Sequence, residues 1–162
     1  MRGNRFIYAL LAVGAIGMFL GHGIWAILGQ DTFIELITGS FDHVFGVTVP
    51  TGTATAWLTG IGWLDITISI FILLLLIGDI QGKGRLYGLA YSGLALVVYA
   101  WAALWGFVTA AARVTAKGEL MPELWDVVER APNFMLPAGL TYLVYQHRSE
   151  RTRSGVTSGR AG

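Results

Sequence analysis

Five side chains that could bind a ligand or move a proton lie within or beside long apolar stretches of this chain. His22 and Asp65 each interrupt such a stretch, and Glu129, Arg130 and Asn133 stand close together in another. A carboxylate at the centre of a membrane-spanning helix costs about 2.5–3.5 kcal/mol on insertion scales, so it faces protein or water and marks a candidate functional site. A histidine beside it lowers the cost of burying both groups. We therefore expect these residues to form a ligand-binding or proton-relay site.

The apolar stretches have the length of membrane-spanning helices. About 20 apolar residues cross a hydrocarbon core of about 30 Å, and residues 54–78 contain Asp65 as their only charge. Only 13% of the chain is charged and 54% is hydrophobic, whereas soluble domains carry about 25% charged residues. We expect an all-α, polytopic membrane four-helix bundle that forms one domain over residues 1–146. Its four spans are predicted at residues 6–28, 54–78, 86–112 and 122–145.

The segments outside the spans have patterns of their own. Between the first two spans, apolar residues recur at helical spacing from Phe33 to Phe41, and Thr32 and Glu35 have the spacing of a capping box. We expect a short amphipathic helix there, lying on the membrane surface. Residues 147–162 are basic and rich in Ser, Gly and Arg, which predicts a disordered tail.

Lys and Arg are distributed unequally between the two sides of the predicted bundle. The N-terminus, residues 79–85 and the tail hold eight of the 11 Lys and Arg residues, and the opposite side holds Arg113, Lys117 and Arg130. Cytoplasmic segments carry an excess of these residues. We therefore expect a multi-pass protein of the inner (plasma) membrane, with both termini and the tail in the cytoplasm.

This orientation places the polar residues in the outer half of the bilayer. At a rise of 1.5 Å per residue, His22 lies about 9 Å and Asp65 about 17 Å from the outer ends of their spans. Four polar residues of the last span share one helical face, at positions i, i+3, i+4 and i+7. The helix that remains after them is too short to cross the core, so either part of this stripe is drawn into the membrane, facing the bundle interior, or the bilayer adjusts to a short span. Together these groups predict an outward-opening polar pocket; the stripe consists of Asp126, Glu129, Arg130 and Asn133.

Tryptophans could form the wall of this pocket. Trp63 and Trp101 lie deep enough in their spans to do so. Trp25, Trp57 and Trp105 lie at interfacial depth, where tryptophan is common in the absence of any ligand. We assign these three to the membrane interface or to packing.

Each polar group also has a purely structural interpretation. Asp65 could form an internal ion pair with Arg130, and His22 could be a hydrogen-bonded histidine between two helices. Residues 126–133 could instead form the solvent-exposed face of a surface helix. The sequence leaves these alternatives open.

Several kinds of chemistry are disfavoured by the sequence. The chain has no cysteine, which excludes disulfides, thiol relays and iron–sulfur clusters. His22 is the only histidine within a predicted span, so a bis-histidine haem lacks a ligand, and a zinc or copper site would need further ligands. A net charge of +1 argues against a nucleic-acid partner. We expect no metal site.

Three segments resemble the DoxX-like family of four-helix membrane proteins. Phe19-Leu20-Gly21-His22-Gly23 is similar to the family's signature, in which a hydrophobic residue is followed by any two residues and then by His-Gly. The family also has an acidic residue in span two, more often Glu than the Asp65 found here, followed by a Leu-rich stretch and a basic turn. The polar opening of its fourth span is similar to Glu129-Arg130-Ala131-Pro132-Asn133.

The resemblance implies an accessory role more than an independent enzymatic one. Some relatives are small subunits of quinone-linked oxidoreductases, and others look like assembly factors. We expect a subunit that binds a quinone-like or other small amphipathic molecule and that has a membrane oxidoreductase as its partner. His22 would hydrogen-bond a carbonyl of the ligand, and Asp65 would orient His22 or relay its proton. The alternatives are a non-catalytic assembly or interaction protein and a proton-coupled transporter that uses Asp65.

Overall fold

The regular structure of this chain is entirely helical in the residues that the computed structural model describes, 2–81, 84–118 and 124–158. Three helices are long and apolar enough to span a membrane, over Phe6–Ile27, Thr51–Ile80 and Gly93–Lys117. The prediction of an all-α chain is thereby confirmed, together with the presence of helices that have the length and composition of membrane spans. The helices are α1 (Arg2–Ile27), α2 (Asp31–Phe45), α3 (Thr51–Ile80), α4 (Gly84–Lys117), α5 (Leu124–Glu129) and α6 (Pro132–Ser158).

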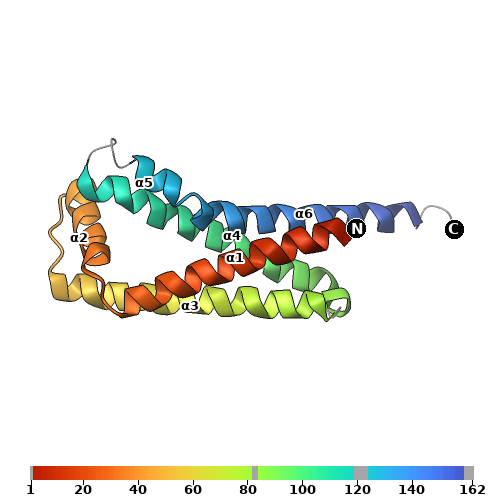
Figure 1. Cartoon of the computed structure of the whole chain (residues 1–162). Helices are drawn as coiled ribbons and strands as arrows, with labels where there is room; N and C mark the ends of the chain where they lie inside the picture. Colours follow the sequence, from red (N-terminus) through yellow and green to blue (C-terminus); the bar gives the residue numbers. More distant parts are fainter. Residues whose placement is uncertain (1, 82–83, 119–123, 159–162) are drawn as a thin grey trace.

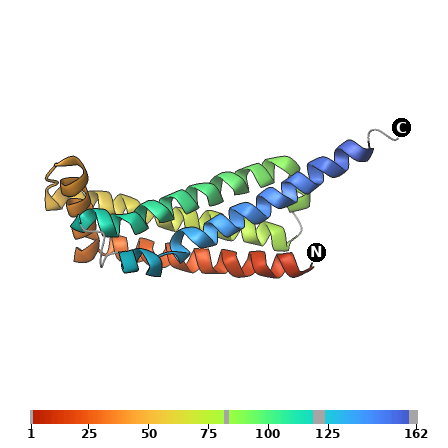
Figure 2. The ribbon, with the colours of Figure 1, turned by 90° about the horizontal axis from the view of Figure 1, so that it is seen from above.

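Four long helices lie alongside one another, and α2 crosses one end of the group (Figures 1 and 2). Helix α1 packs mainly on α3, and α4 packs mainly on α6, while further contacts join α1 to α6 and α3 to α4. Helix α2 packs against the ends of α4 and α3. Both termini lie at the end away from α2 (Figure 1), so α2 and the termini mark opposite ends of the molecule.

The core between these helices combines small residues with a few large ones. Ala12 and Ala15 of α1 are fully buried, together with Ile72 of α3, Tyr99 of α4 and Leu140 of α6. Many large apolar side chains instead point outwards, because the apolar surface runs all round the helices. A helix that is hydrophobic on every side is typical of a membrane span, where lipid covers the outer face. Examples are Phe6, Leu74 and Val97, which are 71%, 57% and 68% exposed.

Helices α1 and α3 come into backbone contact at a pair of glycines. A Cβ atom on Gly23 would lie 2.7 Å from the carbonyl oxygen of Gly62, and one on Gly62 would lie 2.7 Å from that of Gly23. Small residues permit this approach, as is common between membrane helices. Not every glycine of α1 serves a close helix contact, however, because a Cβ on Gly17 or Gly21 would meet nothing within 4 Å.

Helix α2 agrees with the predicted amphipathic helix in position, but its start differs from the prediction. It begins at Asp31, and the residue before it, Gln30, makes no side-chain capping bond. The predicted capping box is therefore wrong, because Thr32 already lies inside the first turn. The helix packs on α4 through a hydrogen bond of 2.8 Å between the hydroxyls of Ser40 and Thr115.

The C-terminal part of the chain differs from the single continuous span predicted at 122–145. Helix α5 ends at Glu129 and α6 begins at Pro132, while residues 122 and 123 lie outside the described residues. Proline is favoured at the first position of a helix, where its missing N–H needs no partner. Helix α6 then continues to Ser158, so residues 147–158 are helical where we expected disorder, and residues 159–162 are outside the description. No proline follows Pro137 to stop the helix.

Candidate ligand-binding cavity

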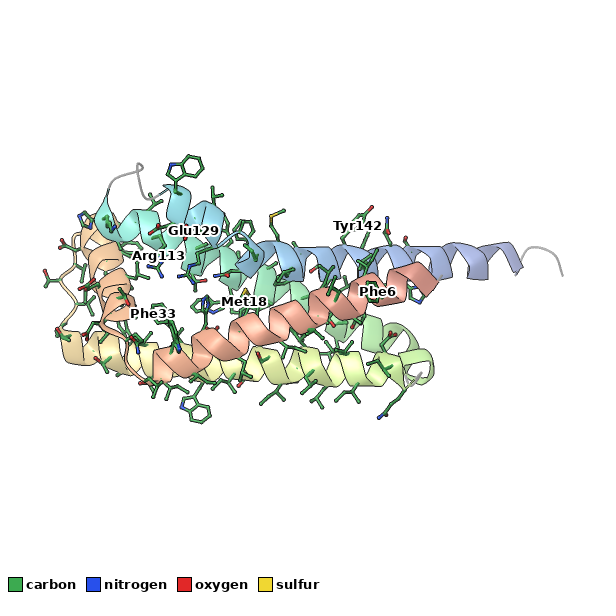
Figure 3. The ribbon with its side chains drawn as sticks, in the orientation of Figure 1. Phe6, Met18, Phe33, Arg113, Glu129 and Tyr142 are labelled. Atoms are coloured by element: carbon green, nitrogen blue, oxygen red, sulfur yellow. The ribbon has the colours of Figure 1, made fainter. Side chains whose placement is uncertain are left out.

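A cavity of about 230 Å³ lies at the α2 end of the molecule. Figure 3 shows Phe33 of α2 and Arg113 of α4 pointing into this space. Its apolar wall includes Phe33, Leu58 and Val108. The side chains on its wall that bear charge or can hydrogen-bond are His22, Ser40, Asp65, Trp105, Thr109, Arg113, Arg130 and Asn133.

Asp65 is anchored by a tryptophan. Its side chain is only 4% exposed, and its Oδ1 accepts a hydrogen bond of 2.7 Å from Nε1 of Trp105. Burying a carboxyl group without a partner would be strongly unfavourable. The bond therefore joins α3 to α4 and fixes the direction in which the carboxyl group faces.

His22 is held by Arg130. The Nη1 atom of Arg130 lies 3.1 Å from Nε2 of His22. A guanidinium group can only donate, so Nε2 accepts, and a neutral ring then carries its proton on Nδ1. The edge of the ring packs on Phe33, with centroids 6.1 Å apart. Arg130 in the turn before α6 and Phe33 of α2 thus hold the imidazole from two sides.

This contact decides between two interpretations left open by the sequence. Arg130 bonds to His22, and in the described part of the chain no ion pair joins it to Asp65. The interpretation of Asp65 as the partner of Arg130 is therefore wrong. His22 is hydrogen-bonded to a distant part of the chain, as its structural interpretation expected, but the partner lies in the turn between α5 and α6 and not in a second helix.

Arg113 is the charged residue of the cavity that the sequence analysis missed. We had counted it only as a cation on the outer side. It follows Trp105 and Thr109 at intervals of four, and all three residues line the cavity. Residues at this spacing share one helical face, and this periodicity is the signal that could have identified Arg113.

The structure brings together four of the five predicted polar residues. His22, Asp65, Arg130 and Asn133 all line the cavity, with Asn133 only 7% exposed. Glu129 is exposed and does not line it. The predicted polar stripe assumed one continuous helix, whereas the break between Glu129 and Pro132 turns the residues on its two sides in different directions.

The predicted tryptophan walls are wrong. Trp63 and Trp101 are 60% and 48% exposed and lie outside the cavity. Two residues along a helix correspond to a rotation of about 200°, so Trp63 faces away from the side on which Asp65 lies. Trp101 is one helical turn from Trp105, which lines the cavity in its place.

Comparisons of the chain with protein-family models, with curated proteins and with solved structures found no match. The function therefore has to be inferred from the cavity itself.

The cavity combines hydrogen-bond donors with apolar walls. Arg113 and Arg130 offer guanidinium N–H groups to oxygen atoms, and the amide of Asn133 can donate as well as accept. Aromatic and aliphatic side chains cover the remaining wall. Such a site suits a molecule with an oxygen-bearing head and an apolar body.

Proposed function

We propose that this chain is a polytopic four-helix membrane protein that binds a small amphipathic molecule in the cavity beneath α2. In this arrangement α1, α3, α4 and α6 form the bundle, both termini lie in the cytoplasm, and α2 lies at the outer surface of the inner membrane. The three apolar helices support the membrane location. The placement of α2 and the termini at opposite ends supports the topology (Figure 1).

One observation carries the binding function. Charged and polar side chains from α1, α2, α3, α4, the turn before α6 and α6 itself meet around an open cavity, and the pairs that they form, His22 with Arg130 and Asp65 with Trp105, do not fill it. Packing alone would favour filling such a space, because protein interiors are close-packed and voids are destabilising. A largely apolar cavity with a few convergent polar groups is the usual form of a small-molecule site.

The ligand class in this proposal includes quinone-like molecules. A carbonyl oxygen of such a ring could accept from Arg130 or Arg113, with the ring against Phe33. The resemblance of three segments to the DoxX-like family supports the role of an accessory subunit, which would bind such a molecule as the partner of a membrane oxidoreductase. The chain itself would then be no independent enzyme.

The alternative of a purely structural interaction protein expects no cavity large enough for a ligand. The cavity of about 230 Å³ therefore favours binding over that alternative. A proton-coupled transporter would need Asp65 to change partners during transport. In the structure this carboxyl group is held by Trp105, which favours a fixed structural or ligand-orienting role.

The test is native mass spectrometry of the protein in its own lipids, followed by identification of any co-purifying small molecule. We expect one bound molecule per chain, lost in the variants His22→Ala and Ala112→Trp, the second of which fills the cavity. Leu104→Trp is the matched control, since Leu104 lies on the same helix but is 56% exposed and outside the cavity. A bare chain, or a ligand that survives Ala112→Trp, would contradict the proposal.

A quinone band-shift assay tests the ligand class. If a quinone is bound, its absorption band should shift in the wild type and in Thr67→Ala, an exposed position on α3. The shift should disappear in His22→Ala and in Asp65→Asn. A shift that survives both changes would contradict the assignment of these residues.

A further inference from the structure

Two arginines, Arg113 and Arg130, face the cavity without an ion pair to any carboxylate of the described residues. Within the part of the chain that the structure describes, the guanidinium group of Arg130 hydrogen-bonds only to the ring of His22. The side chain of Arg113 makes no hydrogen bond or ion pair in these same ranges, although it lines the cavity. The charges of the two guanidinium groups act on each other, so their placement in one cavity is electrostatically unfavourable.

The acidic groups nearby do not remove this imbalance. Asp65 lines the cavity, but its carboxyl group bonds to Trp105. Asp126 acts on the charge of Arg113 from outside the lining and without an ion pair among the described residues. The lining therefore carries two cations and one carboxyl group, and one negative charge would balance it.

From this geometry we propose that the cavity binds an amphipathic monoanion whose oxyanionic head lies between Arg113 and Arg130. This inference rests on the proposed function and names the charge of its ligand. A planar guanidinium matches the two oxygens of a carboxylate, and an anion placed between two of them offsets their mutual repulsion. Phe33, Leu58 and Val108 then cover the apolar body. A neutral carbonyl compound would leave this lining with one positive charge in excess.

The size of the cavity limits the ligand. Water occupies about 30 Å³ per molecule in the liquid, so the cavity of 230 Å³ holds a body far smaller than a two-chain lipid. A small aromatic carboxylate fits this description. The head group of an anionic lipid offers the same oxyanion chemistry at the edge of the cavity, and the experiment separates the two sources.

The test measures binding of 4-phenylbutyrate and of its neutral amide, 4-phenylbutyramide, to the full chain in phosphatidylcholine nanodiscs. The two probes have the same shape and differ in charge. Equilibrium dialysis gives both affinities, with empty nanodiscs correcting for partition into lipid. We expect the carboxylate to bind at least tenfold more tightly than the amide, because hydrogen bonds to charged groups are the stronger ones.

Substitutions assign the preference to the two arginines. Arg113→Gln and Arg130→Gln should each remove most of it, whereas Arg113→Lys, which keeps the charge, should retain part of it and so shows that the fold is intact. Lys117→Gln is the control, because Lys117 is an exposed cation on the same helix outside the cavity. Equal binding of the two probes, or a preference that survives both glutamine variants, would overturn the proposal while leaving the proposed function standing.

Two further results complete the test. If neither probe binds the wild type better than it binds Ala112→Trp, the cavity is no ligand site, and the proposed function fails together with this inference. Adding phosphatidylglycerol to the nanodiscs identifies the source of the anion. Displacement of bound 4-phenylbutyrate assigns the site to a lipid head group, and unchanged binding assigns it to a soluble carboxylate.

Discussion

Replacing Trp105 with phenylalanine tests the hydrogen bond that holds Asp65. The change removes the Nε1–H that lies 2.7 Å from Oδ1 and leaves a carboxyl group of 4% exposure without its donor. Hydrogen bonds between membrane helices contribute about 0.6 kcal/mol on average and at most about 1.7, whereas bonds to charged groups in proteins contribute about 1.5–3. Because this bond is short and its acceptor is buried, we expect it to contribute about 1.5 kcal/mol to the free energy of unfolding.

A double-mutant cycle separates this contribution from the lost packing of the indole ring. The single variants are Trp105→Phe and Asp65→Leu, which replaces the carboxyl group with an apolar side chain of similar size. In the Leu background, Trp105→Phe removes packing but no hydrogen bond, so the difference between the two backgrounds is the coupling free energy. Unfolding in mixed micelles, followed by circular dichroism during titration with SDS, gives the four free energies.

The control for this cycle is Trp101→Phe. Trp101 lies one turn away on the same helix and is 48% exposed, so we expect a change within about 0.5 kcal/mol. A coupling free energy below about 0.5 kcal/mol, the usual error of additivity, would refute the argument that Trp105 anchors Asp65.

Two further predictions concern packing and topology. Gly62→Ala should lower the free energy of unfolding by about 1–3 kcal/mol, because its Cβ would meet the backbone of α1. Gly60→Ala is the control: its Cβ meets nothing within 4 Å, so this change should be neutral or slightly stabilising. If SDS titration gave the same loss of unfolding free energy for both variants, the packing of α1 on α3 would be contradicted. Because the chain has no cysteine, single introduced cysteines can report its topology. In intact cells, a membrane-impermeant maleimide should label Asp42→Cys directly and should label Arg153→Cys only after the cells are permeabilised. The reverse pattern would contradict the proposed orientation.

The composition of the chain predicted the helical class and the membrane-spanning lengths well. These features depend on long apolar stretches and on backbone groups that must bond within each helix in lipid, so local sequence determines them. The structure's apolar helices agree with the predicted first and second spans to within three residues at either end. Charge and depth also pointed to His22 and Asp65, which both line the cavity.

Partners and directions could not be predicted in the same way. Whether Asp65 meets Arg130 or Trp105 depends on the rotation of each helix about its axis. The depth of a residue in the membrane does not determine that rotation. Trp105 was assigned to packing because its depth matched the membrane interface. Trp105, Thr109 and Arg113 follow one another at intervals of four residues, and this spacing was the better indicator of the helix face that lines the cavity.

The position of Arg130 depends on a helix break that the charged residues themselves do not indicate. Asp126 to Asn133 have ideal spacing for one face, yet α5 ends at Glu129 and α6 starts afresh at Pro132, so that Arg130 lies in the turn and reaches His22. Further along, Pro137 lacks the N–H that would bond to the carbonyl oxygen of Asn133 in a regular helix. That oxygen packs against Gly106 of α4, where no side chain stands in the way. Pro132, Pro137 and Gly106 contribute no polar side chain to the site. They nevertheless determine where Arg130 and Asn133 reach the cavity.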